Sequence, residues 1–222
     1  MADLLGYDKP PARTMGMIMA DGINNNTREE NDFYPTIDTA ATRAIIEYLE
    51  PYLAAKMEAG ETVLFREPAC GDGQISQVIA EYGYNHLSTD LIDRGYGVSG
   101  VDYLKSEDEP EGMIVLTNPP FKIAREFVLK ALADGADRVY LLLKSTYFQA
   151  SSRIEFFEGT PISRIIPLSW RIDWTGEGSP TMECCWFEWI KGYKGEPVYG
   201  QILRKSKIVE KKCDTTLDLF EK

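Results

Sequence analysis

The sequence has little of the side-chain chemistry on which many enzymes depend. It contains one histidine, His86, among 222 residues, and its four cysteines form no Cys-x-x-Cys pair. Zinc sites are usually built from clustered cysteine and histidine ligands, and a catalytic triad needs a histidine base. We therefore expect no metal site and no histidine-based acid–base catalysis, and we expect His86 to be a structural residue.

Long apolar runs and an excess of positive charge are also missing. The sequence has no run of about 18 apolar residues and no signal-peptide pattern, so we expect a cytoplasmic protein without a membrane partner. The net charge of −11 argues against non-specific coating of nucleic acid, because phosphate binding needs clustered lysine and arginine. The segment 204–212 (RKSKIVEKK) is one place where positive charge does gather.

The periodicity of apolar residues indicates an α/β fold. Helical spacing begins at Thr39 and recurs after residues 73 and 123, and short apolar runs that predict strands separate these helices. Strands that are apolar throughout are typical of a parallel sheet covered on both faces. Beyond residue 164, strand-like segments between glycine-rich turns predict an antiparallel C-terminal hairpin at the sheet edge. Pro51 is expected to bend the first helix or shorten its end.

No internal repeat and no linker interrupts this pattern, so we expect a single domain. The expected parts are an irregular N-terminal arm (1–31), the domain itself (32–203) and a charged C-terminal tail (204–222).

The most unusual residues stand where predicted strands end. The strand predicted at 63–65 runs into EPACGDG (67–73), whose glycines allow a ligand to approach the backbone at the start of a helix. In a doubly wound sheet, ligands bind beyond the carboxyl ends of the strands. A tight strand-to-helix turn also needs glycine, so the glycines alone are weak evidence for a ligand-binding loop. Their position after a predicted strand makes this evidence stronger.

Carboxylates follow the next two predicted strands. Asp90 lies about 20 residues beyond the glycine loop, where an acid can hydrogen-bond the ribose hydroxyls of an adenosine-containing cofactor. The alternatives are that Asp90 only caps a turn or a helix, and that Asp93 holds the ribose instead. Asp102 could accept a hydrogen bond from an adenine amino group, with Tyr103 or Leu104 packed beside it.

The acidity of the glycine loop discriminates among cofactors. Glu67 and Asp72 lie in it, and no lysine or arginine occurs between residues 67 and 73. Two acids would repel a pyrophosphate but suit a ligand that carries an ammonium group. S-adenosylmethionine combines a sulfonium, an amino-acid end and a ribose, so it is the predicted cofactor.

A fourth predicted strand, 113–116, ends in TNPPF (117–121). The two prolines make this turn rigid and leave carbonyl groups as acceptors. The Asn118 side-chain carbonyl and the Pro119 backbone carbonyl could bind both hydrogens of an exocyclic amine, which frees the nitrogen lone pair for in-line attack on a methyl group. Phe121 would stack on the flat ring that carries the amine.

These motifs resemble those of a known family. EPACGDG looks like the first cofactor motif, and TNPPF like the catalytic motif, of S-adenosylmethionine-dependent amino-group methyltransferases, closest to the DNA N6-adenine type and to small phage-borne members. DFYPT (32–36) is similar to the segment that folds against the methionine end of the cofactor in that family. The resemblance covers roughly residues 32–145. It implies a Rossmann-like methyltransferase fold with a mostly parallel, doubly wound sheet, and methylation of adenine N6 in DNA after the base is flipped out.

The motifs and the resemblance together assign roles to individual residues. The predicted catalytic residues are Asn118, Pro119, Pro120 and Phe121. The predicted cofactor-binding residues are Tyr34, Pro35, Thr36, Glu67, Pro68, Ala69, Cys70, Gly71, Asp90, Asp102, Tyr103 and Asn118. The predicted substrate-binding residues are Phe121, Lys144, Trp170 and Arg171.

Some of the later residues have structural alternatives. Trp170 could pack in the core or at a sheet edge instead of contacting nucleic acid, and Tyr147 and Phe148 could either line the pocket or pack in the core. Lys144 and Arg153 could face the same rim.

Other functions fit the same motifs. The NPP motif also occurs in enzymes that methylate the side-chain amide of protein glutamine, a small molecule could carry the amine, and a catalytically silent cofactor-binding subunit would keep the fold. Sequence-reading members of the DNA family usually carry a recognition domain, for which this chain leaves no room beyond its hairpin. The expected partner is therefore DNA that is single-stranded or read with low sequence specificity.

Overall fold

The computed structural model describes residues 39–107, 109–173 and 182–205, so the predicted arm and nearly all of the predicted tail lie outside the described residues. The helices in these residues are α2 (Ala40–Glu58), α3 (Gln74–Glu81), α4 (Ala124–Ala133) and α5 (Ile154–Gly159). The strands are β1 (Leu64–Glu67), β2 (Asn85–Asp90), β3 (Val98–Ser99), β4 (Ile114–Thr117), β5 (Arg138–Lys144), β6 (Arg164–Pro167), β7 (Cys184–Ile190) and β8 (Val198–Tyr199).

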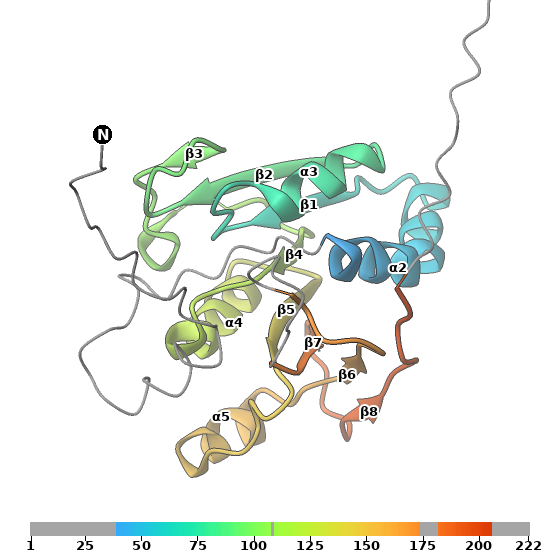
Figure 1. Cartoon of the computed structure of the whole chain (residues 1–222), viewed down its shortest axis with the longest axis vertical. Helices are drawn as coiled ribbons and strands as arrows, with labels where there is room; N and C mark the ends of the chain where they lie inside the picture. Colours follow the sequence, from blue (N-terminus) through green and yellow to red (C-terminus); the bar gives the residue numbers. More distant parts are fainter. Residues whose placement is uncertain (1–38, 108, 174–181, 206–222) are drawn as a thin grey trace, which may run out of the picture.

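The described strands form one sheet in the order β3-β2-β1-β4-β5-β7-β6-β8 (Figure 1). The neighbouring strands β3, β2, β1, β4 and β5 all run parallel to one another. Strand β7 runs antiparallel to both β5 and β6. The chain builds outward from β1 to β3 and then crosses to β4, so the order reverses between β1 and β4, which is where doubly wound sheets bind ligands. The predicted α/β fold with a mostly parallel sheet and an antiparallel C-terminal edge is confirmed.

Two strand predictions differ from the structure. The third predicted strand is shorter than expected, since β3 comprises only Val98 and Ser99. The predicted hairpin consists of β6 and β7, whereas β8 pairs with β6 in parallel. The chain reverses direction after β7 and passes to the outer side of β6, so β8 runs in the same direction as β6.

Helix α2 forms although Pro51 lies inside it. The helix continues to Glu58, so the expectation that Pro51 shortens it is wrong. Pro51 faces solvent, and Leu49 and Leu53 on the opposite side are fully buried against the sheet. Packing of this apolar face offsets the loss of one backbone hydrogen bond.

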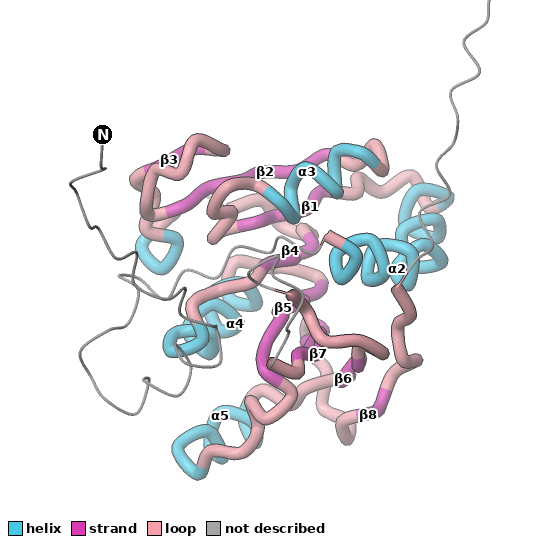
Figure 2. Tube along the Cα trace, viewed as in Figure 1, coloured by secondary structure: helices cyan, strands magenta, loops and turns pink. Residues whose placement is uncertain are grey.

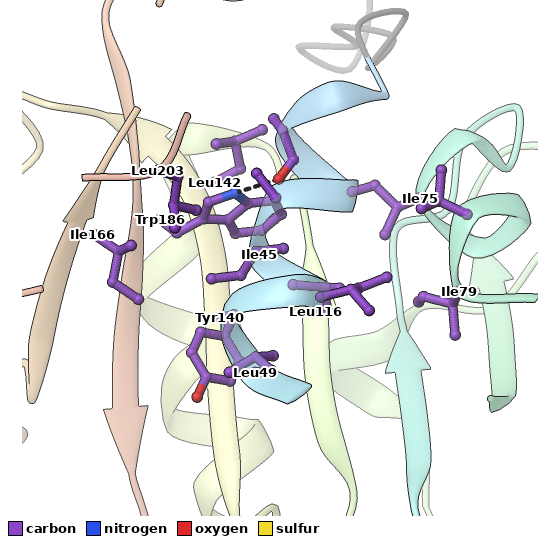
Figure 3. Packing of buried hydrophobic residues seen from close by; sticks show 14 of the residues in the cluster. Ile45, Leu49, Ile75, Ile79, Leu116, Tyr140, Leu142, Ile166, Trp186 and Leu203 are labelled. Carbon is purple, nitrogen blue, oxygen red and sulfur yellow. Dashed lines mark hydrogen bonds between the residues drawn. The ribbon is translucent and has the colours of Figure 1, made fainter. Parts of the chain in front are cut away.

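Two apolar clusters hold the sheet between its helices. The first joins α2 and α3 to one face, where the Trp186 indole N–H donates to the Ala41 carbonyl at 3.1 Å (Figure 3). The second joins α4 and α5 to the other face, where Phe187 and Trp189 stack with their centroids 6.3 Å apart. Alternate residues of β4, β5 and β7 enter opposite clusters, which explains why these strands are apolar throughout.

The β2–β3 end of the sheet is less covered than we expected. The connection from β2 to β3 is a loop without a helix (Figure 2), and both residues of β3 are exposed. A cavity of about 560 Å³ lies over this end, lined among others by Leu87, Val98 and Glu109. Full cover on both faces therefore holds only for the centre of the sheet. None of the helices in the described residues is long and apolar enough to span a bilayer.

Candidate active site

The glycine loop after β1 is held to the end of β2. Gly71 and Gly73 have φ of +56° and +87°, which residues with a Cβ rarely adopt. The Gly71 N–H donates to Asp90 Oδ2 at 2.8 Å. A Cβ on Gly73 would lie 2.2 Å from the Tyr96 ring, so Tyr96 closes over the start of α3. Glycine is required in this loop by both conformation and contact.

Glu67 lies beneath the loop rather than on its surface. Its side chain is 1% exposed and accepts a hydrogen bond from the Ser76 hydroxyl on α3, which also contacts the Ser88 hydroxyl. Burial raises the pKa of Glu67 well above its usual range, and the nearby Asp90 adds to this effect. The geometry directs this carboxyl toward α3, where it supports the loop.

The other loop residues differ in exposure. Pro68 and Cys70 are buried and Ala69 is partly exposed. Burial raises the pKa of the Cys70 thiol to about 12, and its Sγ lies 3.6 Å from the Tyr96 carbonyl. The thiol is therefore protonated at neutral pH, and a protonated thiol is a weak nucleophile.

Asp90 organises the turn that follows β2. Its two carboxylate oxygens accept from the N–H groups of Gly71 and Ile92, each at 2.8 Å, and Arg94 lies 3.5 Å away. The turn-capping role is thus present in the structure. The neighbouring Asp93 is exposed and accepts from the Gly95 N–H at 3.0 Å.

Asp102 and Tyr103 lie after β3 in different environments. Asp102 caps the short helix η2 (Tyr103–Lys105) and pairs with Lys105 at 2.7 Å, which lowers the pKa of the Asp102 carboxyl. Tyr103 is 2% exposed, and its ring lies between the cationic groups of Arg66 and Lys130, at 5.3 and 5.2 Å. Tyr103 therefore has almost no surface to offer a ligand, and its ring also packs against Phe127 on α4, with the centroids 5.1 Å apart.

The TNPPF turn leaves β4 directly beside the glycine loop, because β4 pairs with β1. Pro119 is buried and Asn118 partly so, and Pro120 caps the helix η3 (Phe121–Ile123). The Pro120 carbonyl accepts from the Ile123 N–H at 3.1 Å, which fixes the turn. Lys144 at the end of β5 lies 5.7 Å from the centroid of the Phe121 ring.

The structure brings most of the predicted residues to one edge of the sheet. The glycine loop, Asp90 and TNPPF meet at the carboxyl ends of β1, β2 and β4, and Lys144 lies beside Phe121. Trp170 is partly buried against the first core cluster, while Arg171 is exposed and pairs with Glu183 at 2.8 Å. Tyr34, Pro35 and Thr36 lie outside the described residues.

Sequence reasoning missed the residues that hold the loop in place. Ser76 forms hydrogen bonds with Glu67 and Ser88 beneath the loop. The Tyr96 ring covers the loop, and the Tyr96 hydroxyl lies 3.3 Å from His86 Nε2. One signal was available, because Ser76 is the only polar residue at an inward-facing position of α3, next to Ile75 and Ile79. A buried hydroxyl implies a polar partner.

The part of the site that the structure describes contains no metal-binding cluster. Among residues 39–107, 109–173 and 182–205, no group of three or more histidine, cysteine, aspartate or glutamate side chains could hold a metal ion.

Comparison with solved structures identifies the fold. No protein-family model matches the sequence, and a sequence comparison with curated proteins also finds no match. A proposed RNA methyltransferase from Pyrococcus horikoshii matches with a TM-score of 0.52 and 16% identity, over 81% of this chain and 99% of that one. A proposed class I S-adenosylmethionine-dependent methyltransferase from Listeria monocytogenes matches with a TM-score of 0.51 and 13% identity, over 85% and 71%. The chain has the Rossmann-like fold of these methyltransferases.

Proposed function

We propose that the protein transfers a methyl group from S-adenosylmethionine to the exocyclic N6 amine of adenine in DNA. The observation that carries this proposal is the rigid TNPPF turn after β4, next to the glycine loop after β1, in a methyltransferase fold. The amide and carbonyl groups of this turn suit a conjugated amine, which is a poor nucleophile until its lone pair is freed.

The residues at the ends of β1 to β3 fit this cofactor by charge. Asp72 and Asp90 lie at the loop, which contains no lysine or arginine between residues 67 and 73. A carboxylate can accept about four hydrogen bonds, so Asp90 retains acceptor capacity for ribose hydroxyls after binding two N–H groups. Asp102 would accept from the adenine amino group, because its pair with Lys105 is exposed and exchanges with little cost.

The remaining cofactor contacts follow from the same arrangement. Ala69 and the Gly71 backbone border the space beyond β1, with Glu67, Pro68 and Cys70 supporting them from beneath. By resemblance, Tyr34, Pro35 and Thr36 would close over the methionine end. When bound, the cofactor supplies an electrophilic methyl group on its sulfonium.

The catalytic turn would act by orientation. The Asn118 and Pro119 carbonyls bind the two amine hydrogens and draw the nitrogen toward tetrahedral geometry, which aims its lone pair at the methyl carbon. The methylated nitrogen is acidic enough to release its proton to water, so no side-chain base is needed. Phe121 stacks on the base, and Pro120 keeps the stacking ring in place through its bond to Ile123.

Substrate contacts would come from the residues around this turn. Lys144 lies over Phe121, where its charge can meet a phosphate of the flipped nucleotide. Trp170 and Arg171 follow β6. The ion pair of Arg171 with Glu183 is exposed, so Arg171 can exchange it for a contact with a phosphate.

The test is transfer of labelled methyl from S-adenosylmethionine to unmethylated single-stranded and double-stranded DNA, followed by nucleoside mass spectrometry. N6-methyladenine in the product is the expected result. Label found only in RNA, protein or a small molecule would support methyltransferase activity but refute DNA as the substrate. Cofactor binding without transfer to any of these would indicate a silent subunit.

A further inference from the structure

Positive charge gathers on one rim of this acidic protein. The segments 121–126 and 144–155, which follow β4 and β5, contain four basic residues and two acidic ones, whereas the whole chain has 24 basic and 35 acidic residues. The basic residues are Lys122, Arg125, Lys144 and Arg153. One of the two acids, Glu126, pairs with Arg125 at 2.8 Å. We call these two segments the substrate rim.

The two segments of the substrate rim form one surface. Strands β4 and β5 are parallel neighbours, so the chain leaves both at the same edge of the sheet. Lys144 reaches across to the Phe121 ring at 5.7 Å. The Arg153 guanidinium lies 4.0 Å from the centroid of the Tyr147 ring. These contacts place Lys144 beside Phe121, and they place Arg153 beside Tyr147 in the loop that follows Lys144.

An exposed aromatic ring stands on this surface. Tyr147 is 5% exposed and packs in the second core cluster, but the adjacent Phe148 is 43% exposed. The loop that carries Phe148 is ordered by its own hydrogen bonds, from the Tyr147 N–H to Lys144 and from the Gln149 N–H to Thr146, both at 2.9 Å. These hydrogen bonds order the backbone on both sides of Phe148, and its ring is exposed to solvent.

We propose that the substrate rim binds unpaired nucleotides beside the target adenine, with Phe148 stacking on the neighbouring base and Lys122 contacting a phosphate. Exposed aromatic rings flanked by cations are the usual elements of single-strand binding, and stacking accepts any base. This inference rests on the proposed function and adds to it a source of affinity that does not depend on sequence. It also predicts a preference for single-stranded or opened DNA, because a paired base cannot stack on a side chain.

The first experiment compares Phe148→Ala with Tyr199→Ala. Tyr199 is an exposed aromatic residue, 72% accessible, on β8 at the far edge of the sheet. With single-stranded adenine oligonucleotides, Phe148→Ala should raise the KM about 5- to 150-fold, which corresponds to one lost stacking contact. The kcat, the KM for S-adenosylmethionine and the activity on a mononucleotide should stay unchanged. Tyr199→Ala should match the wild type.

A spectroscopic signal separates stacking from a general structural effect. We expect 2-aminopurine placed next to the target adenine to change its fluorescence on binding to the wild type, and to lose this change with Phe148→Ala. Phe148→Trp should restore both the signal and the KM, because it restores the ring. Thermal melting checks that each variant folds.

The phosphate contact is tested by salt dependence. Lys122→Gln should reduce the slope of log KM against log salt by about 0.7, the value for one phosphate on a single strand. Lys194→Gln, at an exposed lysine after β7, is the matched control and should leave the slope unchanged.

The outcomes distinguish the two proposals. If the wild type methylates adenine in oligonucleotides and Phe148→Ala leaves both KM and fluorescence unchanged, the substrate rim does not bind the neighbouring base, while the proposed function stands. If the wild type methylates no nucleic acid, the proposed function fails and the inference fails with it.

Discussion

The carboxyl edge of the sheet consists of two regions with opposite character. At the ends of β1 to β3 the functional groups are acids, and the carboxyl groups of Glu67 and Asp90 accept hydrogen bonds from serine and backbone donors. At the ends of β4 and β5 the groups are cations and aromatic rings, and Phe148 and Lys122 are exposed. The two carboxyl groups of the first region are held by hydrogen bonds inside the protein, whereas these two side chains of the second region are exposed to solvent.

This difference shows how an acidic protein can bind an anionic polymer. The net charge of −11 averages over both regions. Charges act mainly within about 8–10 Å in physiological salt, so a local rim of cations can attract phosphates although the protein as a whole is negative. The acidic region suits a small cationic cofactor, and the basic region suits the larger substrate.

The largest effect is expected at the boundary of the two regions. Asn118→Ala should lower methyl transfer by about 100- to 1,000-fold, because the substrate amine loses a preorganised acceptor. Cofactor affinity should fall far less than turnover, although Asn118 is also a predicted cofactor contact, and calorimetry with S-adenosylmethionine measures it separately. Asn118→Asp keeps an acceptor and should lose less activity than Asn118→Ala. Equal turnover in Asn118→Ala and the wild type would refute the proposed role of the turn.

A smaller effect is expected within the acidic region. Asp90→Ala should weaken S-adenosylmethionine binding by about 10- to 100-fold, because hydrogen bonds to a buried carboxylate contribute about 1.5–3 kcal/mol. The exposed neighbour Asp93 provides the control. Asp93→Ala should bind within about 2-fold of the wild type, since an exposed carboxylate contributes little. The opposite pattern would assign the ribose contact to Asp93.

The sequence predicts the sheet and the edge at which the site lies because strand ends are local features. Apolar runs set the strands, and the residues that follow them fall together once the strands are parallel. This argument located Gly71, Asp90 and Asn118 without any coordinates. For Lys144 it allowed only that the side chain could face the same rim, and the structure places Lys144 5.7 Å from the Phe121 ring because β4 and β5 are adjacent.

The environment of each side chain could not be predicted in the same way. Whether Glu67 faces a ligand or Ser76 depends on how α3 packs, and Tyr103 is buried because Arg66 and Lys130 enclose it. These contacts join residues far apart in the chain. The continuation of α2 through Pro51 has the same origin, because burial of the helix face outweighs local propensity.

The glycine loop offers a test of how rigidly the acidic region is built. Gly73→Ala would place a Cβ against the Tyr96 ring, whereas Gly83→Ala, at a similar φ of +80°, would meet no atom within 4 Å. Both variants lose about 1–2 kcal/mol from left-handed backbone strain. Gly73→Ala should lose about 1–3 kcal/mol more, because Tyr96 must move. Urea unfolding measures the difference, and equal losses would show that Tyr96 adapts freely.

The smallest effect concerns the buried acid of the same region. Burial raises the pKa of Glu67 above its ordinary value of 4.5, so the folded protein favours the neutral carboxyl. This contribution to stability is complete below about pH 4.5 and is lost as the pH rises through the raised pKa of the folded state.

The variant Glu67→Gln tests this pH dependence, because its side chain cannot ionise and its amide oxygen can still accept a hydrogen bond from Ser76. The melting temperature of Glu67→Gln relative to the wild type should therefore increase from pH 4 to pH 8. Glu58→Gln, at an exposed glutamate, gives the baseline. A difference that stays constant with pH would mean that the fold does not favour the neutral form of Glu67, and that the acidic region holds this carboxylate charged.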